Sequence, residues 1–129
     1  MNIEHPNIAV LQKFDPTNIA GSSDVIALDA VFHYFNPRLP DVHGDYVGVE
    51  GFKSFFKKIE KQTNEAFKVN LVSATPIGNE LVVIHRKHET PFEGENITVD
   101  VVVVWRIVDS KIVEVWDIPS IYHHDIKSK

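Results

Sequence analysis

The chain contains no cysteine, and this absence excludes disulfide bridges, thiolate metal sites and cysteine nucleophiles together. It also lacks any apolar run close to the ~20 residues that a membrane-spanning helix needs. Its first residues show neither the basic head nor the apolar stretch of a signal peptide. Acidic residues outnumber basic ones, 18 to 13, and the formal net charge of -5 argues against a nucleic-acid or anionic-membrane partner. We therefore expect a cytoplasmic protein that binds neither nucleic acids nor membranes.

Internal repeats, low-complexity tracts and linkers are missing as well, so the sequence shows no domain boundary. A chain of 129 residues is long enough to bury a hydrophobic core without disulfides or metals. We therefore predict a single domain that spans residues 1–129.

The last third of the chain is dense in valine, isoleucine and tryptophan. Residues 96–108 and 111–118 are predicted to form two strands of a long β-hairpin, joined by the polar turn Asp109-Ser110. The valines at 101–104 are too apolar for a strand with one face in water. We expect both faces of the sheet to be covered, one by helices and the other by a second copy of the protein. Two more strands are predicted at about 67–76 and 81–90, with turns at 78–79 and 93–95.

Helical periodicity marks the first half of the chain. Apolar residues recur at helical spacing in residues 5–14, which end before Asp15-Pro16, and again in residues 49–63. In the second segment the apolar residues form one stripe, and the lysines on the opposite face are predicted to be solvated. The remaining segments are predicted to be a helical turn at 24–28, an aromatic strand at 31–35 and a loop at 38–48. Because helices come first and an antiparallel meander follows, the sequence predicts an α+β fold.

Three segments carry a resemblance to a known family. They are VFHYFNP at 31–37, GDYVGVEG at 44–51, which opens the long helix, and VWDIP at 115–119, which ends the final hairpin. Together with the order of the elements, they resemble the nuclear-transport-factor-2-like family, also called SnoaL-like, along nearly the whole chain. The resemblance implies a cone-shaped, strongly curved, mostly antiparallel sheet wrapped around N-terminal helices, which is a cystatin-like α+β roll. It also implies a conical pocket and a homodimer.

The ketosteroid isomerases of this family use three groups that this sequence does not supply. Their general base is an aspartate just before a proline, where this chain has Asn36, which cannot accept a proton at neutral pH. Their oxyanion-stabilising aspartate falls near Val103, and residues 5–14 contain no tyrosine for the third role. We therefore expect no ketosteroid isomerisation.

Two other branches of the family use different pocket chemistry. Limonene-epoxide hydrolases need an Arg-x-Asp pair on the middle strand, and the corresponding positions fall near Val83 and His85, so that motif is absent. Polyketide cyclases use a pocket aspartate and histidine as acid and base. His85 with Asp117, or His33 with Asp117, would imitate this pair, but resemblance of fold alone does not establish a reaction.

The orientation of His33 stays open at this point, because both faces of its strand are aromatic. It lies in the cavity if residues 31, 33 and 35 face inward, and outside the cavity if residues 32, 34 and 36 do. His85 shares a strand face with Leu81 and Val83, which favours the pocket, whereas His88 is expected to meet solvent.

Asp117 follows an apolar strand and precedes Ile118 and a proline. At the rim or floor of a pocket, burial would raise the pKa of its carboxyl group. The alternative is a structural carboxylate that accepts backbone N–H bonds where the strand ends. A two-residue turn at 109–110 places Arg106 on the face of Asp117, and a three-residue loop places Trp105 there. The family resemblance favours Trp105 inside and Trp116 outside.

Three functions from different classes remain open. The favoured one is binding of a small hydrophobic molecule in a conical pocket, with no metal and no cofactor. The second is an acid–base enzyme, an isomerase, cyclase or hydrolase, whose catalytic candidates are His33, His85 and Asp117. The third is a dimeric interaction module with a vestigial cavity. The predicted pocket-lining residues are Phe32, Tyr34, Phe35, Asn36, Phe56, Val83, Val103, Trp105 and Val115. The outer sheet face is predicted to carry Asp100 and the homodimer contact residues Val102, Val104 and Trp116.

Overall fold

A six-stranded sheet is the frame of the molecule. The computed structural model describes residues 5–63, 68–92 and 95–120. No helix within these ranges is both long enough and apolar enough to cross a membrane. The elements in chain order are α1 (Pro6–Gln12), the 3-10 helix η1 (Ala20–Val25), β1 (Ile26–Tyr34), β2 (Gly44–Val47), α2 (Gly48–Thr63), β3 (Lys68–Ile77), β4 (Leu81–Phe92), β5 (Glu95–Val108) and β6 (Lys111–Pro119).

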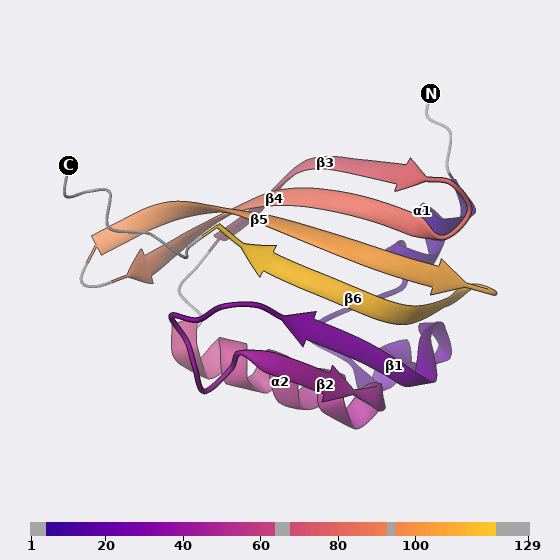
Figure 1. Ribbon diagram of the computed structural model, residues 1–129, viewed down its shortest axis with the longest axis horizontal. Coiled ribbons are helices and arrows are strands. Elements are labelled where there is room, and N and C mark those ends of the chain that lie inside the picture. The colour runs from indigo at the N-terminus through magenta and orange to yellow at the C-terminus, as the bar shows by residue number, and fades with distance from the viewer. Residues whose placement is uncertain (1–4, 64–67, 93–94, 121–129) are drawn as a thin grey trace.

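The strands lie in the order β2-β1-β6-β5-β4-β3. Each neighbouring pair is antiparallel except β1 and β6, which run parallel. The sheet curves, with α2 lying along β1 and β2 and α1 near the ends of β3 and β4 (Figure 1). This arrangement confirms the predicted α+β class with a curved, mostly antiparallel sheet.

The core forms where α2 packs on the sheet. Phe52 and Phe55 of α2 are buried against Phe32 of β1, with ring centroids 5.3 and 4.3 Å from that of Phe32. Full burial of each such ring stabilises the folded state by roughly 1.5–3 kcal/mol. The apolar stripe predicted in residues 49–63 is therefore the face that holds the helix to the sheet.

Two glycines allow α2 to begin close to β2. Gly48 has a φ of +74°, in the left-handed region that other residues rarely adopt, and it makes the turn from strand to helix. A Cβ atom at Gly51 would lie 2.8 Å from the backbone of Tyr46, so only glycine permits this close approach. The family-like segment at 44–51 thus encodes the angle at which α2 leaves the sheet.

Two predictions about the first half of the chain were wrong. Residues 24–28 were expected to be helical, but only Asp24 and Val25 belong to the 3-10 helix η1. β1 begins at Ile26, because pairing with Ile112 of β6 outweighs the local pattern. The predicted loop at 38–48 contains the edge strand β2, whose four residues pair with the end of β1. The predicted helix at 49–63, the strands of the second half and the turn at 78–79 are confirmed, whereas the turn at 93–95 falls partly outside the described residues.

The final hairpin combines a two-residue turn with a β-bulge. Asp109 and Ser110 have φ values of 53° and 64°, and Val108 pairs directly with Lys111. The pairing then shifts between Arg106 and Ile107, so that one extra residue of β6 is inserted. Because the bulge reverses the alternation, Trp105 and Asp117 share the helix-facing side of the sheet despite the two-residue turn.

Candidate functional site

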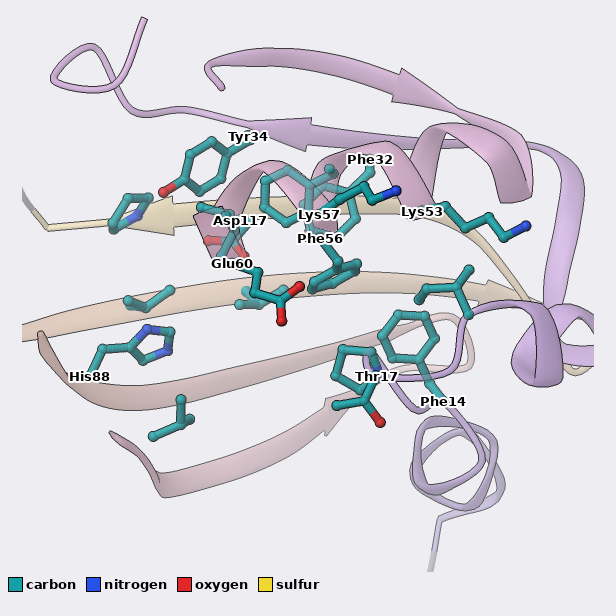
Figure 2. A pocket seen from close by; sticks show the side chains of 18 of the residues that line it. Phe14, Thr17, Phe32, Tyr34, Lys53, Phe56, Lys57, Glu60, His88 and Asp117 are labelled. Atoms are coloured by element: carbon teal, nitrogen blue, oxygen red, sulfur yellow. The ribbon is translucent and has the colours of Figure 1, made fainter. Parts of the chain in front are cut away.

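A cavity of about 1140 Å³ lies between the inner, helix-facing side of the sheet and the segments that cover it. Residues of β1, β4, β5 and β6 form one wall, and residues of α2 and of the segment between α1 and η1 form the other (Figure 2). The volume slightly exceeds the roughly 300–1,000 Å³ that is typical of small-molecule sites. A drug-sized molecule therefore fits with room for water.

One end of the cavity is aromatic. The ring of Phe14 lies 5.3 Å from Trp105 and 5.9 Å from Phe56, and Phe56 lies 5.6 Å from Phe32. Trp105 is only 4% exposed, and its indole N–H has no hydrogen-bond partner within the described ranges. A buried donor without a partner costs on the order of 1–3 kcal/mol, so this end is apolar with one unmet donor in its wall.

The other end of the cavity is polar, and Figure 2 shows Tyr34, Asp117 and His88 gathered there, away from Phe14. Tyr34 of β1 lies beside Asp117 of β6 in the parallel pair. Arg86 and His88 reach the cavity from β4, on the far side of β5. Three strands that are distant in sequence therefore bring these side chains to one end of the cavity.

Asn36 fixes the position of Tyr34 at this end. Its side-chain amide donates to the Tyr34 hydroxyl over 3.0 Å, and its amide oxygen accepts from the backbone N–H of Arg38 over 3.0 Å. Burial raises the pKa of the Tyr34 phenol, so the hydroxyl keeps its proton. Asn36, which stands where the isomerases carry their base, therefore acts in this chain as a buried structural amide.

Burial raises the pKa of Asp117 to about 7, although the positive charge of Arg86 acts in the opposite direction. Burial also lowers the pKa of Arg86, and the charge of Asp117 opposes this change. Neither side chain has a hydrogen bond or an ion pair in the part of the chain that the structure describes. The two groups interact through the cavity without direct contact, and Asp117 is therefore about half protonated near neutral pH.

His88 is uncharged at neutral pH, because burial and the neighbouring charge of Arg86 lower its pKa to about 4. It had been predicted to meet solvent, and the structure corrects this prediction. His88, Arg86 and Ile84 pair with Val99, Val101 and Val103 of β5, all on the inner face of the sheet. Arg86 and His88 are thus two polar pocket residues that the sequence interpretation missed.

His33 lies on the outer face of the sheet, so its proposed place in the cavity was wrong. Its two ring nitrogens lie 2.8 Å from carboxylate oxygens of Asp45 and of Glu114, and its ring stacks on Trp116 at 5.5 Å. Burial lowers the pKa of His33, but the two carboxylates outweigh this effect and the net shift is upward. Phe32, Tyr34 and Asn36 take the inner positions of β1, and His33 belongs to an outer-face network with two carboxylates.

His85 also lies on the outer face, which corrects the prediction that it enters the cavity together with Val83. Its Nε2 lies 2.7 Å from Asp100, which also accepts a hydrogen bond from Lys87 over 2.9 Å. The hydrogen bonds from Lys87 and His85 lower the pKa of Asp100. The outward position predicted for Asp100 agrees with this network.

The remaining predicted pocket residues divide into three groups. Phe35 is 46% exposed and packs edge-on against His43 outside the cavity, which corrects its predicted place. Val115 is fully buried on the inner face but belongs to the core and not to the cavity wall. The predicted residues that do line the cavity are Phe32, Tyr34, Asn36, Phe56, Val103, Trp105 and Asp117.

The lysine face of α2 is exposed to solvent, as predicted, and part of it also borders the cavity. Lys53, Lys57 and Glu60 lie at the rim of the cavity (Figure 2), and Lys53 pairs with Glu50 over 3.4 Å. Within the described ranges, no cluster of three or more His, Asp or Glu side chains has the geometry of a metal site.

Solved structures with the same fold support this description. TerC, crystallised with polyporic acid, has a TM-score of 0.72 and 21% identity, and the match covers 88% of this chain and 90% of TerC. An NTF2-like protein from Anabaena variabilis has a TM-score of 0.70 and 22% identity over 93% of this chain and 94% of its own. A protein from a Jannaschia species, named as a SnoaL-like polyketide cyclase, has a TM-score of 0.70 and 14% identity over 94% and 90%.

These identities establish a common fold and not a common activity. The sequence has no significant match among curated proteins. A family model described as the SnoaL-like domain matches residues 8–115, which confirms the resemblance seen in the sequence, and the chain belongs to this family.

Proposed function

We propose that this SnoaL-like domain binds a small, largely hydrophobic molecule in the cavity, with the polar end of the ligand at Asp117. The observation that carries this proposal is a cavity of about 1140 Å³ with aromatic walls and a few polar groups gathered at one end. Binding sites for small molecules have this composition, because apolar walls supply affinity and sparse polar groups fix orientation. TerC, which shares the fold, was crystallised with polyporic acid.

One feature favours binding over a vestigial cavity. Phe32, Phe56 and Trp105 form part of the apolar wall of the cavity and leave a volume of about 1140 Å³ beside them. Empty space beside large aromatic rings forfeits packing contacts that a ligand would restore. A ligand with an apolar body that enters this cavity would therefore gain contacts with these rings.

Nile red, a neutral apolar dye that fluoresces in dry surroundings, tests this proposal. We expect bright binding to the unmodified protein and a loss of affinity of at least tenfold in Val103→Trp, whose new side chain occupies the cavity. Val102→Trp is the matched control, because Val102 is the next residue along β5 and faces outward. Equal dye binding by the two folded variants would place the dye outside the cavity and refute the proposal.

A second candidate function is acid–base catalysis by Asp117. A base works best when its pKa lies near the working pH, and that of Asp117 is about 7. Asp117 would take a proton from a weakly acidic C–H bond of the bound molecule, and the resulting oxyanion would receive hydrogen bonds from Arg86 and Tyr34. In this scheme the predicted histidine–aspartate pair is replaced by an aspartate with an arginine and a tyrosine.

The α-protons of β-tetralone, an apolar ketone, provide a test that needs no knowledge of the natural substrate. We expect the protein to accelerate their exchange in deuterated water, with a rate that rises through a pKa of about 7. Asp117→Asn should lower the exchange rate by on the order of 100-fold. Exchange that is equally fast with this variant would remove Asp117 as the base and leave binding as the function.

A further inference from the structure

We propose that the ligand of this cavity is an amphiphilic anion, with an apolar body and a carboxylate or similarly compact oxyanion held by Arg86. The inference rests on the proposed function and names the class of ligand. It follows from three features of the polar end: the direction of its hydrogen bonds, its uncompensated buried charge, and the charge of the cavity wall.

Apart from the carboxyl group of Asp117, the polar end offers hydrogen-bond donors and few free acceptors. Arg86 presents five N–H donors and, within the described ranges, makes no hydrogen bond. The Tyr34 oxygen already accepts from Asn36, and no described residue accepts the hydroxyl proton of Tyr34. The amide oxygen of Asn36 is occupied by the backbone N–H of Arg38. A ligand group that matches this end must therefore be rich in acceptors, as a carboxylate is.

Arg86 carries a half-buried positive charge that lacks a direct counterion. Its interaction with Asp117 acts at a distance, and no ion pair joins the two side chains in the described part of the chain. A guanidinium binds a carboxylate through two parallel, charge-assisted hydrogen bonds, which a carboxamide with its single acceptor oxygen does not reproduce. Asp117 does not oppose such an anion, since its protonated form donates a hydrogen bond and an anion beside it favours that form.

The wall of the cavity is basic although the protein is acidic. The whole chain has 13 basic against 18 acidic residues. His88 at the polar end is neutral. The charged lining residues are the cations Arg38, Lys53, Lys57 and Arg86 and the carboxylates Glu50, Glu60 and Asp117. The cavity lining therefore has one more cation than carboxylates, whereas the whole chain has a net negative charge, and field focusing in a cleft strengthens the attraction for an anion.

Three naphthalene derivatives of equal size separate charge from shape: naphthalene carboxylate, the neutral naphthalene carboxamide, and naphthylmethylammonium. Calorimetry with the unmodified protein should give an affinity for the carboxylate that is at least about tenfold above that for the carboxamide, with the ammonium weakest. This comparison needs no variant, so it does not depend on the folding of any mutant.

Arg86→Met retains the length of the side chain and removes its charge. We expect it to weaken binding of the carboxylate by about 10- to 100-fold and to leave binding of the carboxamide within about threefold. Arg106→Met is the matched control, because Arg106 lies on the outer face in an ion pair with Glu80. Arg106→Met should change neither affinity.

Equal affinities of the carboxylate and the carboxamide for the unmodified protein would overturn the inference and leave the proposed binding function intact. Absence of binding by all three compounds would overturn the proposed function and the inference with it. A preference for the carboxylate that survives in folded Arg86→Met would overturn the assignment of the anion site to Arg86.

Discussion

Replacing Asp117 by asparagine tests the central electrostatic feature of the site, because it removes the charge and keeps the shape. Burial raises the pKa of this carboxyl group from the ordinary 3.8 to about 7. Each unit of this shift corresponds to 1.36 kcal/mol, so ionised Asp117 lowers the free energy of unfolding by up to about 4 kcal/mol. Water in the open cavity screens part of the charge, and we expect Asp117→Asn to stabilise the fold by about 2–4 kcal/mol near pH 8.

The effect has a definite sign and pH window. Between about pH 4 and pH 7 the folded state keeps the proton of Asp117 while the unfolded state has lost it. Folding then takes up a proton, and stability falls as the pH rises through this range. Above about pH 7 both states are ionised and the loss is constant. The gain from asparagine should therefore be small near pH 4, grow between about pH 4 and pH 7, and then level off.

Urea unfolding of both proteins across this pH range measures the difference directly. Asp100→Asn is the control, because Asp100 lies on the outer face with His85 and Lys87, and its pKa is lowered. This second variant should not stabilise the protein near pH 8. A gain for Asp117→Asn that is absent, or that does not vary with pH, would show that Asp117 is not held in a desolvating cavity.

Three further predictions concern the outer face and the core. In urea unfolding, His33→Gln should destabilise the protein more near pH 6 than near pH 9. A raised histidine pKa stabilises the folded state below the ordinary pKa of 6.5, and this stability is lost as the pH rises through the pKa of the folded state. Equal losses at both pH values would contradict this prediction. Phe32→Ala should lower the free energy of unfolding by about 3–5 kcal/mol, because Phe32 is 1% exposed among the rings of α2, and a loss under about 1 kcal/mol would argue against the core described here. We also propose that two copies pair through the outer sheet face, where Val102 and Ile118 are 37% and 44% exposed. Sedimentation velocity should show a dimer that Val102→Glu converts to a monomer. A monomeric unmodified protein would refute this proposal.

The sequence was sufficient to predict the elements whose signal is local. The long helix α2 and the strands of the second half have strong periodicity or a strong β-branched composition, and their bounds differ from the structure by a few residues at most. The edge strand β2 has only four residues, Gly44–Val47, and forms because β1 offers it a pairing partner. Such a strand depends on contacts distant in sequence, so its local composition suggested a loop.

The site was harder to predict because it depends on which face each strand turns inward. In β4, Leu81 and Val83 are as apolar as Val82 and Ile84, so alternation of hydrophobicity does not select a face. The register with β5 decides the question, and it turns Arg86 inward. In β6 the decisive feature is a bulge of one residue, after which each residue faces the side of the sheet opposite to that expected from the turn. The family resemblance placed Trp105 inside correctly, whereas counting from the two-residue turn alone would have placed Arg106 there.

The two faces of the sheet differ in how their ionisable groups are satisfied, and this difference separates structural groups from candidates for function. On the outer face, His33 and His85 lie within 2.8 Å of carboxylates that hold them in place. On the inner face, Asp117 and Arg86 have no such partner among the described residues, although both are partly buried. Proteins satisfy nearly all buried polar groups, and exceptions weaken the fold unless something else occupies the site. Asp117→Asn should therefore raise the free energy of unfolding, because the wild-type fold is less stable for holding an unpaired carboxyl group beside an unpaired cation. In return, both groups are available to a ligand.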